Sequence, residues 1–267
     1  MISKEERTDK EKEAYNQGLN RKKYSQGFGH AQAGYANERK KKAIADILKR
    51  GKGKDILELG STSWKQFIDF EAYPPKSLTC INISEKELEK GIKASKKIKK
   101  KQDCPPPPIF QIMDAHNLNF PDNTFDFVFG TGILHHLDFE IAVKEISRVL
   151  KEDGEMVFLE PLGRNPIGKL VRRLTPEART ADEKPLDKWH FQLLEQYFNM
   201  DNSFYQLFYV PAGVLSKHIF SSPYNPLTRA ADCLDMWLEK ISKKRGVCLY
   251  YRMVVIHGTQ KIPLTTA

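Results

Sequence analysis

The sequence predicts an α/β fold in which helices cover both faces of a doubly wound, mostly parallel sheet, with an antiparallel strand at its C-terminal edge. First, apolar runs of strand type alternate with helical patterns between residues 54 and 160, an order that right-handed crossovers turn into a parallel sheet. Second, two more apolar segments follow with a helical stretch between them, which adds antiparallel strands at one edge. Third, a chain of 267 residues, 40% of them hydrophobic, can bury a large core.

Residues 1–53 are expected to form a helical wrap or lid outside the sheet. A polar helix is predicted over Glu5–Asn16, followed by a stretch in which glycines interrupt aromatic residues. A second helix, Tyr35–Lys49, has apolar residues on one face and ends before Gly51. The aromatic stretch fits a lid over a pocket, and it fits equally well a wrap that packs on the outside of the core.

Residues 54–162 are predicted to form the central core. Asp153 and Gly154 are expected to turn its last helix into its last strand. The expected strands are Asp55–Leu59, Ser77–Ile83, Ile109–Met113, Phe125–Gly130 and Glu155–Glu160. The expected helices are Trp64–Phe70, Glu85–Lys101 and Phe139–Lys151.

Residues 163–267 are predicted to form cap helices and the last strands of the sheet, continuous with the core. Pro161–Lys188 is rich in proline, arginine and acidic residues and has little strand character. The elements expected after it are the helix Lys188–Phe198, the strand Ser203–Val210, the helix Leu227–Ser242 and the strand Val247–Gly258.

The net charge of +9 favours an anionic partner, which could be nucleic acid, a membrane surface or an acidic metabolite. A solvated lysine-rich surface explains the charge as well, and the same two interpretations apply to the lysine cluster Lys93–Lys101. Met1–Lys12 contains no apolar signal-peptide core, and no apolar run is long enough to span a bilayer. We therefore expect a cytoplasmic protein with no integral membrane segment.

The four cysteines are scattered singly along the chain. This spacing gives no zinc signature, so no metal site is predicted, and it favours a reducing compartment. The cysteines are Cys80, Cys104, Cys233 and Cys248.

The first predicted strand, Asp55–Leu59, carries a carboxylate at Glu58 and is followed by a turn at Gly60. An apolar strand that ends in this way delivers a nucleotide-like cofactor to the edge of a parallel sheet. The usual Gly-x-Gly-x-x-Gly pattern is absent, because Ser61, Thr62 and Ser63 follow the first glycine.

Three ordered motifs follow this turn: Ile112–Val128, Gly130–Leu137 and Glu145–Phe158. Together with the first strand they resemble class I S-adenosylmethionine-dependent methyltransferases, in the small-molecule, type 11-like branch. The resemblance covers about residues 54 to 162. It implies a Rossmann-like fold, S-adenosyl-L-methionine as the cofactor and an enzyme that transfers a methyl group.

The resemblance also implies a cofactor site. The turn at Gly60, Ser61 and Thr62 would hold the methionyl carboxylate, and Glu58 the methionyl ammonium. Asn82 stands where the family usually has an acid for the ribose hydroxyls, so the charge-assisted part of that contact is lost. The remaining positions implied are Ile83 on the adenine face, Asp114 with Ala115 and His116 at the adenine amino group, and Gly130 with Thr131 after the fourth strand.

For the transfer step, His135 and His136 are the candidate general bases, because they follow the fourth strand and imidazole titrates near neutral pH. In some members of the family one such histidine only caps or packs. Glu160 and His190 are expected to contribute to the acceptor pocket, although an ordinary stabilising loop explains them equally well.

The leading hypothesis is transfer of a methyl group to an oxygen or nitrogen atom of a small molecule, lipid-like or glycan-linked. An RNA acceptor is disfavoured, because Gly130–Ile133 replaces the Asn-Pro-Pro-Tyr loop of nucleic-acid amino methylation sites. A non-catalytic binding or regulatory protein on the same scaffold stays open, and a nicotinamide-dependent oxidoreductase is the weakest alternative. The sequence does not indicate an oligomeric state.

Overall fold

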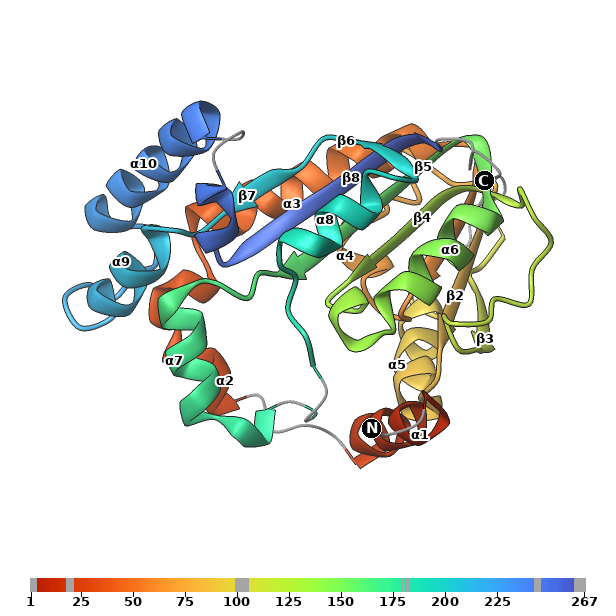
Figure 1. Ribbon diagram of the computed structural model, residues 1–267, viewed down its shortest axis with the longest axis horizontal. Coiled ribbons are helices and arrows are strands. Elements are labelled where there is room, and N and C mark those ends of the chain that lie inside the picture. The colour runs from red at the N-terminus through yellow and green to blue at the C-terminus, as the bar shows by residue number, and fades with distance from the viewer. Residues whose placement is uncertain are drawn as a thin grey trace.

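A computed structural model describes residues 4–17, 22–98, 106–178, 180, 183–242 and 246–261. Within these residues one 8-stranded sheet has the strand order β3-β2-β1-β4-β5-β8-β6, and β7 also pairs with β8 (Figure 1). The strands are β1 (Asp55–Leu59), β2 (Ser77–Asn82), β3 (Ile109–Ile112), β4 (Phe125–Thr131), β5 (Leu150–Pro161), β6 (Phe198–Met200), β7 (Ser203–Tyr205) and β8 (Met253–Lys261).

Strands β1 to β5 pair in parallel, and β8 pairs antiparallel with β5, β6 and β7. The chain leaves β1 for β2 and β3 on one side and returns to β4 on the other, so strand order reverses between β1 and β4. In an open α/β sheet a crevice forms outside the carboxyl ends of the strands at such a reversal. The predicted α/β fold with its antiparallel edge is confirmed.

Helices cover both faces of the sheet because successive strand residues point to opposite sides. Leu57 packs in a core cluster with helices α6 (Phe139–Val149) and α8 (Lys188–Leu194). Its neighbour Ile56 packs in a second cluster with α3 (Tyr35–Leu48) and α4 (Trp64–Phe67). The helix α5 (Glu85–Ser95) follows β2 and contacts both β2 and β3.

A third cluster joins the N-terminal segment around Phe28 to helices from the C-terminal part of the chain. Phe28 and Ala31 pack with side chains of α7 (Pro166–Leu174), α9 (Tyr209–Ser216) and α10 (Pro226–Ser242). These helices gather on the left of Figure 1, with the short α2 (Lys22–Gly27) beside α7. The helix α1 (Lys4–Gln17) lies elsewhere, against α5. The segment around Phe28 and the helix α1 therefore pack against different parts of the molecule.

Several predicted boundaries are wrong. The strand β5 begins at Leu150, earlier than expected, and its pairing with β4 jumps from Phe125–Leu150 to Phe127–Glu155, so the residues between them, which include Asp153 and Gly154, bulge out of the ladder. The predicted helices Trp64–Phe70, Glu85–Lys101, Phe139–Lys151 and Lys188–Phe198 end earlier than expected, as α4, α5, α6 and α8; Lys99–Lys101 and Cys104 lie outside the described residues.

The predicted strand Ser203–Val210 is a strand only at its start and enters a helix at its last two residues. Strand β7 ends at Tyr205, Gln206 takes a positive φ of 73°, and α9 starts at Tyr209. The carboxylate of Asp235 accepts the backbone N–H groups of Leu207, Phe208 and Tyr209 at 2.7 to 3.1 Å, which caps the first turn of the new helix. The last strand likewise starts late, at Met253, after a 3-10 turn over Val247–Tyr250.

The helix α7 was not predicted, although its start signal is present. Asn165 accepts the N–H of Gly168 at 2.8 Å, and Pro166 takes the first helical position. Among the described residues, no helix combines the length and apolar character needed to cross a bilayer.

Candidate functional site

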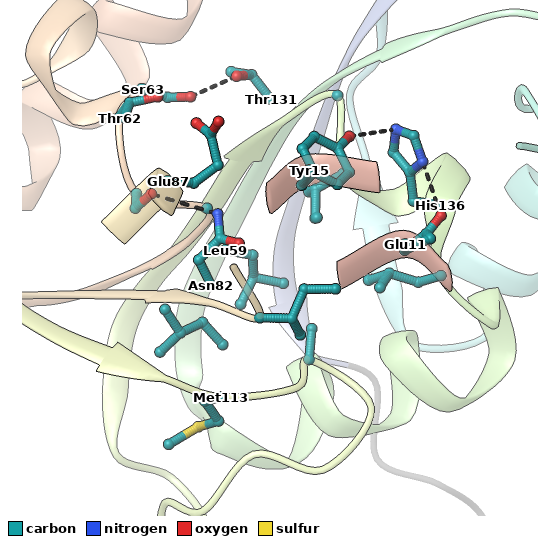
Figure 2. Close-up of a pocket in the computed structure, with 18 of the residues that line it drawn as sticks. Glu11, Tyr15, Leu59, Thr62, Ser63, Asn82, Glu87, Met113, Thr131 and His136 are labelled. Carbon is teal, nitrogen blue, oxygen red and sulfur yellow. Dashed lines mark hydrogen bonds and ion pairs between the residues drawn. The ribbon is translucent and has the colours of Figure 1, made fainter. Parts of the chain in front are cut away.

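A cavity of about 270 Å³ opens at the carboxyl ends of β1, β2 and β4, where the strand order reverses (Figure 2). The turn after β1, the end of β2, the loops after β3 and β4, and α1 form its walls. Its polar lining residues are Glu11, Tyr15, Ser61, Thr62, Ser63, Gln66, Asn82, Glu87, Asp114, His116, Thr131 and His136.

The turn after β1 is built around Gly60, whose φ of 121° suits glycine and few other residues. Gly60, Ser61 and Thr62 all line the cavity, as expected from the sequence. The hydroxyl groups of Ser63 and Thr131 lie 2.5 Å apart and connect this turn to the end of β4.

Glu58 lies beneath the turn and outside the cavity lining. Its Oε1 accepts the N–H of Ser63 at 2.6 Å and that of Trp64 at 3.3 Å, while Oε2 is buried with no hydrogen-bond partner. Burial raises the pKa of this carboxyl, and contacts with Cys80 and the two amides oppose the rise. Glu58 is placed to shape the turn, and it lies outside the residues that line the cavity.

The helix α5 presses against the same turn through Gly91. A Cβ atom at this position would lie 2.3 Å from the carbonyl oxygen of Ser61 and 2.6 Å from Cε1 of Phe110. Only glycine therefore permits this approach of helix to turn.

At the end of β2, Asn82 and Ile83 line the cavity as expected. The Oδ1 atom of Asn82 accepts the N–H of Ser84 at 2.9 Å, and Nδ2 lies 3.4 Å from Oγ of Ser61. Glu87, in the first turn of α5, adds a carboxylate to this wall (Figure 2). Sequence reasoning missed Glu87, because Ser84 followed by Glu87 is a helix-start pattern and Ser84 does cap α5.

The loop after β3 brings Asp114, Ala115 and His116 into the cavity lining. Asp114 Oδ1 accepts the backbone N–H of His116 at 2.9 Å and lies 2.6 Å from its Nδ1, while His116 Nε2 accepts the N–H of Asp138 at 2.7 Å. The ring of His116 therefore carries its proton on Nδ1 and donates it to Asp114.

After β4, Thr131 lines the cavity but Gly130 does not. Gly130 lies within the sheet, where a Cβ atom would lie 2.8 Å from the carbonyl oxygen of Leu59. Gly130 affects the cavity only indirectly, because its lack of a side chain lets β1 and β4 lie close together beneath the cavity.

The two histidines occupy different positions. His136 lines the cavity, with Nε2 3.1 Å from the Tyr15 hydroxyl and Nδ1 3.0 Å from Glu11 Oε1, so that α1 holds the ring from both sides (Figure 2). His135 lies outside the lining, with its ring centroid 4.1 Å from that of His136. Glu11 and Tyr15 were not predicted, because more than a hundred residues separate them from His136 and no local pattern marks the contact.

Glu160 and His190, the predicted acceptor contacts, are both outside the cavity. Glu160 is fully buried; its Oε1 accepts the N–H of Ile133 and of Leu134, and its Oε2 lies 2.6 Å from His135 Nδ1. His190 caps α8, where its Nδ1 accepts the N–H of Asp187 at 2.9 Å and burial lowers its pKa.

Residues 57–158 match the family described as "Methyltransferase domain". The resemblance deduced from the sequence is thereby confirmed for this segment. This segment, which runs from within β1 into β5, is therefore similar to methyltransferase domains.

Two demethylmenaquinone methyltransferases are similar to part of this chain. The demethylmenaquinone methyltransferase of Geobacillus sp. (strain WCH70) is 32% identical over 121 residues, which is 43% of this chain and 50% of that protein. The demethylmenaquinone methyltransferase of Staphylococcus aureus (strain JH9) is 32% identical over 124 residues, 45% of this chain and 48% of that protein. The chain thus spans about half the length of the relatives that it matches.

Solved structures share the fold. A geranyl diphosphate C-methyltransferase from Streptomyces coelicolor A3(2), in complex with Mg²⁺, geranyl diphosphate and S-adenosyl-L-homocysteine, aligns with a TM-score of 0.57 at 12% identity, covering 84% of this chain and 79% of that one. The [4+2]-cyclase SpnF aligns with a TM-score of 0.53 at 17% identity, covering 84% and 81%. Because one of these proteins is a cyclase, the fold alone does not determine the reaction.

Proposed function

We propose that this protein is an S-adenosylmethionine-dependent methyltransferase that methylates an oxygen or nitrogen atom of a small, lipid-like acceptor. The observation that carries the proposal is the charge of the cavity. The carboxylates of Glu11, Glu87 and Asp114 line it, and none of its described lining residues is lysine or arginine. This lining suits a cationic ligand and opposes the phosphates of a nicotinamide dinucleotide.

The residues present fit S-adenosylmethionine. The turn of Gly60 and Ser61 would receive the methionyl end, and the loop of Asp114 would receive the adenine. Asn82 is engaged with Ser84, so we assign the charge-assisted contact to the ribose to Glu87. When bound, the cofactor supplies a methyl group on a positively charged sulfur.

The acceptor end of the cavity lies between α1 and the loop after β4. There His136 has Nδ1 beside Glu11, which leaves on Nε2 a lone pair that can take a proton or bind a cation. We therefore assign the activation of the acceptor to His136, with His135 packed against its ring.

A lipid-like acceptor is supported by an exposed apolar surface formed by α9 and α10. Leu234, Trp237 and Ile241 lie on one stripe of α10, with Trp237 59% exposed. The groove between the two helices is apolar, and α10 also carries the exposed cations Arg229 and Lys240. Apolar helices with cationic flanks bind the surface of anionic membranes, so we propose peripheral contact there.

The location proposed is the cytoplasm, where a reducing environment would keep the buried cysteine Cys80 as a thiol. The relatives' name, demethylmenaquinone methyltransferase, makes a membrane quinol the first acceptor to test.

Titration calorimetry with S-adenosylhomocysteine is expected to give saturable heat, and NAD is expected to give none. Labelled methyl transfer to a hydroxyl group of a demethylated quinol is then expected to be faster in anionic vesicles than in zwitterionic ones, and transfer to a ring carbon would instead overturn the oxygen or nitrogen acceptor. Folded protein that gives no heat with the cofactor product would refute the proposed function. Cofactor binding without transfer to any lipid extract would instead favour the non-catalytic scaffold.

Glu87→Gln is expected to weaken binding of S-adenosylhomocysteine by about 10- to 100-fold, because a charged hydrogen bond to the ribose contributes roughly 1.5 to 3 kcal/mol. Calorimetry measures the change. The matched control is Glu89→Gln on the same helix, since Glu89 is exposed and pairs with Lys93. If the Glu87 variant and the wild type bound S-adenosylhomocysteine with equal affinity, Glu87 would not contact the ribose.

A further inference from the structure

A cluster of potential metal ligands lies at the wall of the cavity and consists of His135, His136 and Glu183. One potential ligand atom from each lies within 4.8 Å of the others. The three side chains are 9%, 2% and 11% exposed, so the cluster is nearly closed to bulk water. No local sequence pattern marks the cluster, because α6, β5 and α7 separate Glu183 from the histidines along the chain.

Both imidazole rings are oriented by a carboxylate on the same nitrogen. Glu160 Oε2 lies 2.6 Å from Nδ1 of His135, and Glu11 Oε1 lies 3.0 Å from Nδ1 of His136. Because a carboxylate only accepts hydrogen bonds, each ring donates from Nδ1 and keeps its lone pair on Nε2. A carboxylate behind the far nitrogen is the usual second layer of a histidine metal ligand, since it fixes the tautomer and raises basicity.

Glu183, the third potential ligand, is held near the histidines by a backbone hydrogen bond of its neighbour. The N–H of Lys184 donates to the carbonyl oxygen of His135 at 2.9 Å, which ties the segment of Glu183 to the histidine loop. Glu183 Oε1 lies 3.6 Å from Nε2 of His136. Two imidazole nitrogens and one carboxylate oxygen therefore converge from two segments that are attached to each other.

We propose that His135, His136 and Glu183 bind a divalent transition-metal ion, with Zn²⁺ as the best match to two nitrogen donors and one oxygen donor. Ligands about 2.1 Å from one tetrahedral ion lie roughly 3.5 Å from one another, so the side chains must contract by about 1 Å. The Tyr15 hydroxyl lies 3.1 Å from Nε2 of His136, and it must move away before this nitrogen can bind the ion.

A site of three protein ligands leaves one position open to the cavity that His136 lines. An acceptor hydroxyl bound there would lose its proton to solvent at the mouth of the cavity more readily, because the ion stabilises the resulting oxyanion. This role rests on the proposed function, whereas metal binding itself does not. The alternative is that the same groups form only a hydrogen-bonded network that fastens α1 over the cavity.

The test is calorimetry of chelator-treated protein with ZnCl₂, together with metal analysis after dialysis. One ion per chain is expected, and Glu183→Gln and His136→Gln are each expected to weaken binding at least about 100-fold. His190→Gln is the control, since His190 caps α8 away from the cluster. Circular dichroism and S-adenosylhomocysteine binding show whether each variant is folded.

Failure of Zn²⁺ to bind the folded wild type would overturn the metal site, as would binding that Glu183→Gln leaves unchanged. Neither result contradicts the proposed function, provided that S-adenosylhomocysteine still binds. Zinc binding without any binding of the cofactor product would support the metal site and refute the methyltransferase.

Discussion

Replacing Gly91 by alanine is expected to weaken binding of S-adenosylhomocysteine by about 10- to 100-fold and to lower the melting temperature. The added Cβ would lie 2.3 Å from the carbonyl oxygen of Ser61, so either α5 or the turn after β1 must move. Both elements line the cavity, and the turn supplies the backbone proposed to hold the methionyl end. Overpacking of this kind costs roughly 1 to 3 kcal/mol.

Calorimetry and thermal unfolding of the same preparation measure the two effects. Glu89→Ala is the control for any general weakening of α5, because its side chain is exposed. The double variant Gly91→Ala with Phe110→Ala separates the two contacts, since it relieves the clash with the ring at 2.6 Å and leaves the backbone clash. If the double variant regained wild-type affinity, the turn would not depend on α5.

Replacing Lys40 by methionine is expected to raise the free energy of unfolding by about 2 to 4 kcal/mol at pH 7. Burial, together with the charges of Arg252 and Lys41, lowers the pKa of Lys40 from 10.5 to about 7. Burying this amine in α3 therefore costs stability at every pH below about 10.5, where the unfolded chain keeps it protonated. Methionine has a similar length and shape and carries no charge.

The pH dependence of this effect follows from the direction of the shift. Between pH 7 and 10.5 the unfolded chain holds a proton on Lys40 that the folded chain has released, so wild-type stability rises with pH across this window. The advantage of Lys40→Met should therefore be largest at pH 7 or below and should vanish near pH 10.5.

Urea unfolding at several pH values measures the difference between variant and wild type. Lys41→Met, with an exposed side chain one residue further on, is the control and should change stability little. A constant difference at all pH values would show that Lys40 is charged in the folded protein throughout.

The sequence predicted the sheet well because its signals are local. The apolar run Asp55–Leu59 became β1 with the same limits, and residues at the ends of β1, β2 and β4 met in one cavity, as parallel strands require. Boundaries failed where distant groups decide the local backbone, as when Asp235 caps the start of α9.

The site was predicted less well, because residue type and position do not reveal the direction of a side chain. Glu58 and Glu160 end strands as ligand-binding acids do, yet both turn inward to accept backbone N–H groups of the following loops. Glu87 was missed because it belongs to a pattern that is typical of a helix start. Glu11 was missed because the sequence of its helix indicates only a polar helix and not the contact with His136.

The helix α1 is attached to the cavity by polar contacts. Its Glu11 and Tyr15 bond to His136, its Asn16 bonds to Ser84, and Glu11 is its one side chain described as buried. An element with so little apolar burial detaches at a small free-energy cost compared with unfolding of the core. The residence time of a ligand beneath it is then governed by how often the helix lifts, so exchange of spent for fresh cofactor can be fast even when equilibrium affinity is high.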